Sequence, residues 1–323
     1  MRLYRWLFCW IQGLIPVLTA AQAIDNTPAF RNINSNHYVR IYYENDYFTG
    51  TDRDYTQGVY LECINPALQH NPLSALLWRP KHATVNYGLA VEHEAYTPNN
   101  LNEYNIIYGD RPYAAVLFFK TFLMATNTAR RERITTLLST GIIGAWAGGE
   151  DMQKTIHRWI NYILPLGWHN QINNDIILNY QLNYERELYA LPAHFSVAAY
   201  GSARVGTLSD KATAGVSLMT GNFYDPYKDN ATAVHKKVQY YLYAQPVMSL
   251  VVFDATLQGG LFDRGSPYTI PNKDVNRVVL LNRFGLVIIF KRMYLEYYQS
   301  MQTREFQTSV PHRSGGVQFG FGF

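Results

Sequence analysis

Apolar and polar residues alternate with a period of two along much of this chain. The clearest run places Leu178, Tyr180, Leu182 and Tyr184 between Asn179, Gln181, Asn183 and Glu185. Because successive side chains of a strand point to opposite faces, this pattern predicts a strand with one face toward lipid and the other toward water. The last residues alternate in the same way and end in an aromatic residue, Phe323. This ending resembles the terminal strand of outer-membrane barrels.

Further segments are rich in tyrosine and β-branched residues and are predicted to be strands. They are residues 38–43, 55–64, 83–93, 113–124, 133–144, 195–205, 238–252, 255–262, 277–290 and 293–305, with 213–220 as an additional candidate. These segments predict an all-β fold, and because bacterial single-chain barrels have an even number of strands, residues 213–220 leave the exact count open. The expected architecture is a transmembrane antiparallel β-barrel of about twelve strands. A soluble β-sandwich is the alternative.

One segment departs from the β pattern and predicts a short helix over residues 151–164 in a loop. Acidic Glu150 and Asp151 stand where they favour the amino-terminal dipole, and Pro165 and Gly167 follow the helix. The apolar positions at helical spacing are Met152, Ile156, Trp159, Ile160 and Ile163. We expect this stripe to pack onto the barrel rim.

Composition agrees with a secreted barrel. Residues 1–23 have the form of a signal peptide, with Arg2 and Arg5 before an apolar stretch and Ala21-Gln22-Ala23 at the cleavage position. Residues 24–323 are then expected to form one outer-membrane domain, in which Cys63 is the remaining cysteine. Aromatic residues make up 15% of the chain and charged residues 16%, a bias that suits lipid-facing strands. No basic tract predicts nucleic-acid binding.

The unusual polar motifs fall in three of the predicted loops. Asn45 and Asp46 stand near TDRDYT, YTPNN is followed by GDRPYA, and GGEDMQKTIH is followed by GWHNQ. If both termini lie in the periplasm, the loops after the first, third and fifth strands all reach the cell exterior. Residues far apart in sequence would therefore meet at one rim, where the acidic loop is either a cation site or a hydrophilic turn.

Within the predicted helix, Gln153 and His157 are four residues apart and project from the same side. A histidine held by a glutamine near a carboxylate is a candidate general base that activates water. A structural or surface histidine is the alternative. The chain lacks G-x-S-x-G, H-E-x-x-H and a complete calcium loop of the helix-loop-helix type.

At these residues the chain resembles the lipid A 3′-O-deacylase family of Gram-negative outer membranes. The shared motifs are END, TDRxYTxG, YTP, GDRPYA, Gln-x-x-x-His and Gly-Trp-x-x-Gln, in matching order over the first half of the mature chain. The resemblance implies a twelve-stranded barrel in the outer membrane, with a calcium-dependent active site between the barrel wall and the exterior loops. It also implies that the protein removes the 3′-linked acyloxyacyl group of lipid A in the outer leaflet.

The resemblance assigns roles by position. His157 would be the base and Asp46 a ligand of Ca²⁺, which would polarise the ester carbonyl and stabilise the oxyanion. Asn45, Thr56 and Gln153 would position these groups. Some members of the family have a second acid where this chain has Tyr47, a lysine near Glu103 and Tyr104, and a glutamate near Ile163. Those three roles do not transfer.

Two arginines next to the shared motifs have two interpretations. Arg53 and Arg111 would bind lipid A phosphate in one, and would pair with acidic neighbours inside the barrel in the other. Two other functions are also open. One is an outer-membrane phospholipase with the same histidine and metal chemistry. The other is a non-enzymatic pore or adhesin whose acidic loop binds cations. We expect a monomer that acts on lipid A or lipopolysaccharide.

Overall fold

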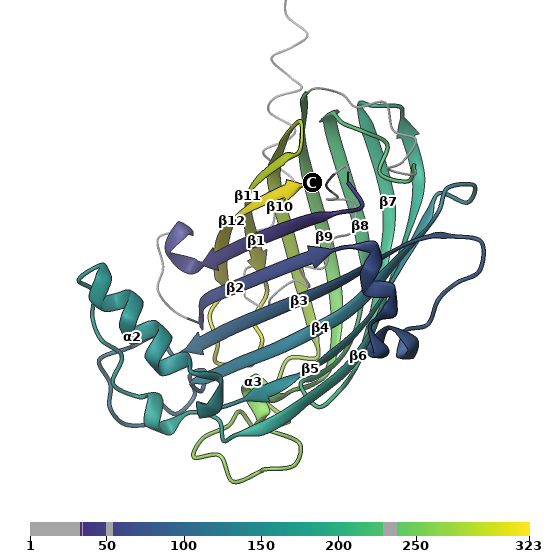
Figure 1. Ribbon diagram of the computed structural model, residues 1–323. Coiled ribbons are helices and arrows are strands. Elements are labelled where there is room, and N and C mark those ends of the chain that lie inside the picture. The colour runs from purple at the N-terminus through teal and green to yellow at the C-terminus, as the bar shows by residue number, and fades with distance from the viewer. Residues whose placement is uncertain (1–32, 34, 50–53, 229–237) are drawn as a thin grey trace, which may run out of the picture.

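The chain folds into a closed antiparallel barrel (Figure 1). The structure is a computed structural model, and it describes residues 33, 35–49, 54–228 and 238–323. In these residues twelve strands each pair with their sequence neighbours, and β1 pairs with β12 to close the cylinder. This confirms the predicted barrel and its even strand number. The predicted signal peptide lies outside the described residues.

The strands and helices follow the chain in simple order. The strands are β1 (Tyr38–Asn45), β2 (Asp54–Ile64), β3 (Thr84–Thr97), β4 (Ala114–Asn127), β5 (Glu132–Ile143), β6 (Asp175–Leu191), β7 (Phe195–Gly206), β8 (Ser209–Asn222), β9 (Val238–Asp254), β10 (Val278–Phe290), β11 (Met293–Gln302) and β12 (His312–Gly322). The helices are α2 (Gly149–Trp159), α3 (Ala255–Gln258) and the 3₁₀ turns η1 (Asp46–Thr49), η2 (Pro66–His70), η3 (Pro72–Leu76), η4 (Ala145–Ala147) and η5 (Trp168–Asn170).

The strand predicted over residues 255–262 is wrong. The chain there forms the short helix α3, because the Asp254 carboxylate accepts the backbone N–H of Thr256 and caps a helical turn. The candidate strand over residues 213–220 is part of β8. It replaces the strand wrongly predicted over residues 255–262, so the number of strands remains even.

Polar side chains face the interior of the barrel and apolar ones face outward. In β1 the inward residues Tyr38, Arg40 and Glu44 are buried, whereas Val39 and Ile41 are exposed. Interior charges are paired across strands, as in Arg40 with Glu62 at 3.0 Å. This arrangement confirms the predicted alternation and matches a barrel whose outer face meets lipid.

None of the helices in the described residues is long and apolar enough to span a membrane.

The antiparallel order places three strand ends at one end of the barrel. We call this end, where β1, β3 and β5 finish, the site rim, and the opposite end, near Tyr38 and Gly322, the terminal rim. Figure 1 shows α2 at the site rim, away from the carboxyl terminus. The loops after β1, β3 and β5 therefore share one rim, as the sequence predicts.

The helix predicted over residues 151–164 is shorter in the structure, and a different face of it packs against the barrel. α2 ends at Trp159 because Asn161 takes a left-handed conformation with φ 53°, and the Tyr162 N–H returns to the His157 carbonyl at 2.8 Å. The predicted packing of its apolar stripe onto the barrel is also wrong. Its buried residues are Gly149, Gln153 and His157, whereas Trp159 is 78% exposed.

Candidate active site

Helix α2 begins in close contact with the outer face of the barrel wall. A Cβ added to Gly149 would lie 2.4 Å from the Cβ of Ala115 and 2.7 Å from the indole of Trp168. Ala95, Ala115 and Ala147 pack with Trp168 into one buried cluster. Small side chains on the wall and a glycine on the helix therefore let α2 approach the strands closely, which buries its polar stripe.

His157 is buried, and one of its ring nitrogens is occupied. Its Nδ1 lies 2.5 Å from the backbone carbonyl oxygen of Ile163. Because a carbonyl only accepts, Nδ1 carries the proton and the neutral ring keeps a free electron pair on Nε2. The reversal after α2 fixes this contact, and the Tyr162 ring packs edge-on against the imidazole at 5.1 Å. His157 therefore has the tautomer that a general base requires.

Gln153 lies one turn before His157 and is held by an indole. The Trp168 Nε1–H donates to the Gln153 Oε1 at 2.7 Å, and both side chains are buried. Since an indole only donates, the amide oxygen must face Trp168. The Gln153 Nε2 has no hydrogen-bond partner among the described residues. The structure thus holds a buried amide donor on the same helix face as the imidazole.

The loop between β1 and β2 adds a buried carboxylate to the site rim. Asp46 opens η1, which packs against β2 and β12, and its side chain is buried. Asn45 ends β1 and donates to the Tyr43 hydroxyl at 3.0 Å. The β2 to β3 register shifts at Thr56, and the Thr56 hydroxyl lies 2.6 Å from that of Thr97. The bulge re-aims Thr56 next to the end of β3.

The loop after β3 supports the α2 region from behind. Its Leu101 carbonyl accepts the Leu166 N–H at 2.9 Å, and the ring of Tyr104 packs on His169 at 4.0 Å. Near the position of the family lysine, Glu103 instead accepts hydrogen bonds from Asn105, and these lower the pKa of the Glu103 carboxyl. This loop is therefore a scaffold for the site in this chain.

Arg111 is placed as a structural residue. It is buried, forms an ion pair with Glu305, and donates to the Thr256 hydroxyl at 2.8 Å. Its guanidinium also stacks over the Tyr96 ring at 4.2 Å. These contacts favour the structural interpretation of Arg111 over the phosphate-binding one. Arg53 lies outside the described residues.

Sequence reasoning did not assign roles to three contributors to the site. Trp168 was part of a shared motif but had no stated partner, and Thr97 belongs to the shared YTP motif but was given no role. Ile163 contributes through its backbone carbonyl, which no side-chain pattern reveals. The Nε2 of the buried His93 lies 3.0 Å from the Ala147 carbonyl oxygen and connects β3 to the segment before α2.

The described residues contain no group of three or more His, Cys, Asp or Glu side chains able to hold a metal ion. A cation at the buried Asp46 would need other oxygen atoms, from amides, hydroxyls or backbone carbonyls, to complete its ligands. Ca²⁺ accepts such mixed oxygen ligands, whereas zinc prefers nitrogen and sulfur. The buried Asp46 carboxylate, an oxygen donor, therefore suits calcium better than zinc.

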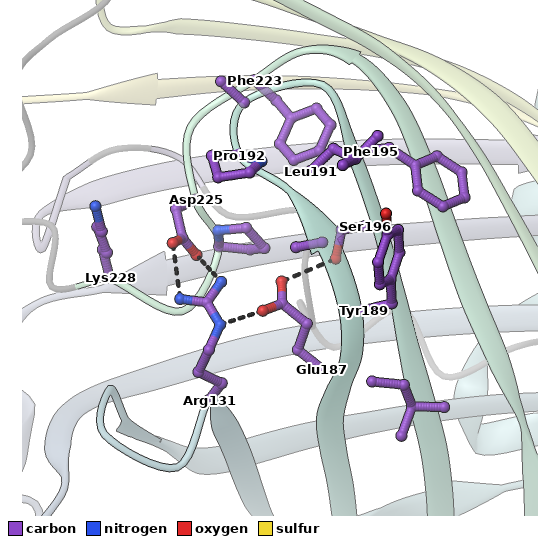
Figure 2. A pocket seen from close by; sticks show the side chains of 14 residues that line it. Arg131, Glu187, Tyr189, Leu191, Pro192, Phe195, Ser196, Phe223, Asp225 and Lys228 are labelled. Atoms are coloured by element: carbon purple, nitrogen blue, oxygen red, sulfur yellow. Dashed lines mark hydrogen bonds and ion pairs between the residues drawn. The ribbon is translucent and has the colours of Figure 1, made fainter.

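A separate cavity of about 570 Å³ lies at the terminal rim (Figure 2). Figure 2 shows Arg131 between Glu187 and Asp225, and it forms ion pairs with both. The hydrogen bond to Glu187 raises the pKa of the Arg131 guanidinium the most, and the hydrogen bond to Asp225 raises it further. These paired charges join the β4–β5 turn to β6 and to the segment after β8. The cavity is a structural junction far from α2.

Together, these features define an outer-membrane β-barrel protein with a buried histidine site on its outer wall at one rim. The chain belongs to the outer membrane protein LpxR family, whose model matches residues 7–323.

A solved structure of an LpxR protein shares this fold. LpxR from Salmonella typhimurium superposes with a TM-score of 0.70 at 21% identity, covering 88% of this chain and 100% of that one. The β domain of the Bordetella autotransporter BrkA gives a TM-score of 0.45 at 9% identity, covering 90% of this chain and 100% of that one. A comparison with curated protein sequences found no match.

Proposed function

We propose that this chain is a lipid A 3′-O-deacylase, a hydrolase of carboxylic esters, with His157 as the general base. The observation that carries the proposal is the bond from the His157 Nδ1–H to the Ile163 carbonyl at 2.5 Å, which leaves Nε2 free to accept a proton. Family membership supports the substrate, since the LpxR family implies lipid A in the outer membrane.

The reaction follows from the chemistry of these groups. The His157 Nε2 takes a proton from water as the water oxygen attacks the ester carbonyl, so the carbonyl oxygen gains negative charge. The Gln153 Nε2–H, which has no hydrogen-bond partner among the described residues, donates to that oxygen. The imidazolium then returns its proton to the sugar oxygen as the acyl carbon–oxygen bond breaks. The products are a fatty acid and a free 3′-hydroxyl group.

Asp46 would hold a Ca²⁺ ion together with neighbouring oxygen donors, and Asn45 and Thr56 would position the groups around it. When bound, calcium supplies positive charge that stabilises an oxyanion. Asp46 contributes its carboxylate, while Gln153 and His157 perform the hydrogen bonding and proton transfer described above.

Chelation tests the calcium part of the proposal. We expect excess EGTA to reduce turnover of purified lipid A at least 100-fold, because the oxyanion loses its principal positive charge, and added Ca²⁺ to restore it. Mass spectrometry of the products provides the measurement. Full turnover in excess EGTA would contradict a calcium requirement.

The same assay separates the alternative phospholipase. Incubation with a glycerophospholipid in place of lipid A should release no fatty acid at a comparable rate. Preferential cleavage of the glycerophospholipid would replace the proposed substrate while keeping the ester chemistry.

A further inference from the structure

Helix α2 presents its apolar residues outward and its polar stripe to the barrel. Gln153 and His157 are buried, while Met152 and Ile156 on a neighbouring flank are only half-buried. The chain just after the helix is more apolar still. We call residues 159–166 the apolar segment. Its large exposed side chains are Trp159 (78%), Ile160 (59%), Tyr162 (44%), Ile163 (45%), Leu164 (38%) and Leu166 (48%).

Water is an unfavourable solvent for this apolar segment. Burying such side chains in an apolar medium is favourable, so their joint exposure to water would carry a large free-energy cost. Contiguous exposed apolar patches of this kind mark contacts with a protein or a membrane. Trp159 and Tyr162 are also the residue types that concentrate where a membrane meets water.

The apolar segment is continuous with the lipid-facing wall. On the outer face of β4, Ala115 is covered, Leu117 packs partly against the Trp168 cluster, and Phe119 is 58% exposed. On β6, which pairs with β5, Ile176 and Leu178 are also exposed. Along β4, the wall covered by α2 thus ends only one or two outward-facing residues before the exposed apolar surface of the barrel. Because that surface faces the membrane, lipid acyl chains are the medium that would surround the apolar segment.

Charged residues occupy the other flank of α2. Lys154 pairs with Glu150 one turn before it, and Asp151 and Arg158 are exposed. A helix with one charged flank and one apolar flank lies in the plane of a membrane interface. The charged flank of α2 would then face the head groups, and the apolar segment would enter the hydrocarbon.

The apolar segment is joined to the general base. The Ile163 carbonyl accepts from His157, and the Tyr162 N–H bonds to the His157 carbonyl. We infer that residues 159–166 insert among the acyl chains of the leaflet at the site rim, and that this contact holds the Ile163 carbonyl on His157. Membrane contact thereby sets the tautomer of the base. The second part of the inference rests on the proposed function, whereas the first does not.

Tryptophan quenching tests the membrane contact. The protein is reconstituted into phospholipid vesicles with brominated acyl chains and compared with its Trp159→Phe variant. We expect the fluorescence contributed by Trp159, obtained as the difference, to fall at least twofold relative to unbrominated vesicles and to resist iodide in the water. If brominated acyl chains do not quench the Trp159 fluorescence, the insertion is overturned. This includes the case in which Trp159 is shielded from iodide by a second copy of the chain rather than by lipid.

An activity ratio tests the link to His157. The Ile160→Asp/Leu164→Asp variant places charge in the apolar segment without changing a group that contacts the imidazole. We expect the ratio of lipid A turnover in vesicles to turnover in detergent micelles to fall at least tenfold. Phe262→Asp, at an exposed residue in a different loop, is the matched control and should keep the wild-type ratio. An unchanged ratio in the double variant would overturn the coupling.

The two experiments separate the inference from the proposed function. If the wild-type protein hydrolyses no lipid A in vesicles or micelles, the proposed function fails. Bromine quenching of Trp159 would then still establish the membrane contact, and its absence would overturn it.

Discussion

At the scale of single residues, the site depends on which atom of each polar side chain is occupied. The Ile163 carbonyl holds the Nδ1 proton of His157, and the Trp168 indole holds the oxygen of Gln153. Each partner can play only one role in a hydrogen bond, so the free atoms are an acceptor on the imidazole and a donor on the amide. A backbone carbonyl thus orients the His157 imidazole.

Trp168 should therefore act as a positioning residue. We expect Trp168→Phe to lower the kcat of lipid A hydrolysis about tenfold, because losing the indole donor frees the Gln153 amide to rotate, a cost of roughly 1–1.5 kcal/mol. The ring volume is largely kept, so the heat-modifiable gel mobility of the barrel should not change. The exposed Trp78→Phe provides the control. Wild-type kcat in Trp168→Phe would exclude this role.

Sequence reasoning identified the candidate side chains Gln153 and His157 but not their hydrogen-bond partners. The spacing of Gln153 and His157 predicted that they share a helix face, and the structure places both in one buried stripe. The partners come from the chain after the helix, where an Asn161 reversal brings back a backbone carbonyl. Because backbone groups are the same in every residue, no sequence pattern identifies that contact.

At the scale of elements, buried contacts connect the loops at the site rim to one another. Arg111 from the loop after β3 pairs with Glu305 from the loop after β11 and bonds to Thr256 in α3. A buried ion pair of this kind adds little compared with an apolar pair, but losing one partner leaves an uncompensated charge. Arg111 thus connects three loops across the barrel mouth.

This arrangement predicts how Arg111 variants behave. Arg111→Met should lower the free energy of unfolding by about 3–5 kcal/mol, because Glu305 is left buried without its partner. The Arg111→Met/Glu305→Leu variant should recover most of that loss. Urea unfolding in detergent measures the stability, and lipid A kinetics on the double variant should show an unchanged KM. A KM increase of tenfold or more would instead assign Arg111 to the substrate.

The errors in the element predictions have physical causes. The segment 255–262 carries strand-forming residues, yet the Asp254 cap and its place at the mouth of the barrel select a helical turn. The apolar stripe of α2 was expected to face the protein because that is the usual arrangement in water. The stripe faces outward here, since the helix lies beside a lipid-facing wall, and sequence periodicity alone does not specify the solvent.

At the scale of the whole molecule, many side chains of the described residues are buried inside the barrel. Inward-facing charges are buried and paired, as in Lys120 with Glu92 at 2.5 Å. At the terminal rim, Phe223 and Tyr227 are buried, and Arg133 donates to the Pro226 carbonyl. At the site rim, the Arg111 contacts cross the mouth. These buried contacts in the described residues disfavour the alternative of an open pore.

A conductance measurement distinguishes these possibilities. We expect the purified protein in planar bilayers to give no stable conductance steps at 1 M KCl, because buried, paired side chains of the described residues occupy the barrel interior. A porin inserted under the same conditions serves as the positive control. Steady, uniform steps from the wild-type protein would show an open channel and support the pore.

His157 is proposed to activate water for hydrolysis of a lipid A ester. The most direct test is mass spectrometry of lipid A from Gram-negative cells that express the wild-type chain or His157→Ala, with folded barrel confirmed in both. We predict that wild-type cells lose the 3′-linked acyloxyacyl group and that His157→Ala, lacking a base worth about 10²–10⁴ in rate, leaves lipid A intact. Equal loss of that group in both strains would contradict the account.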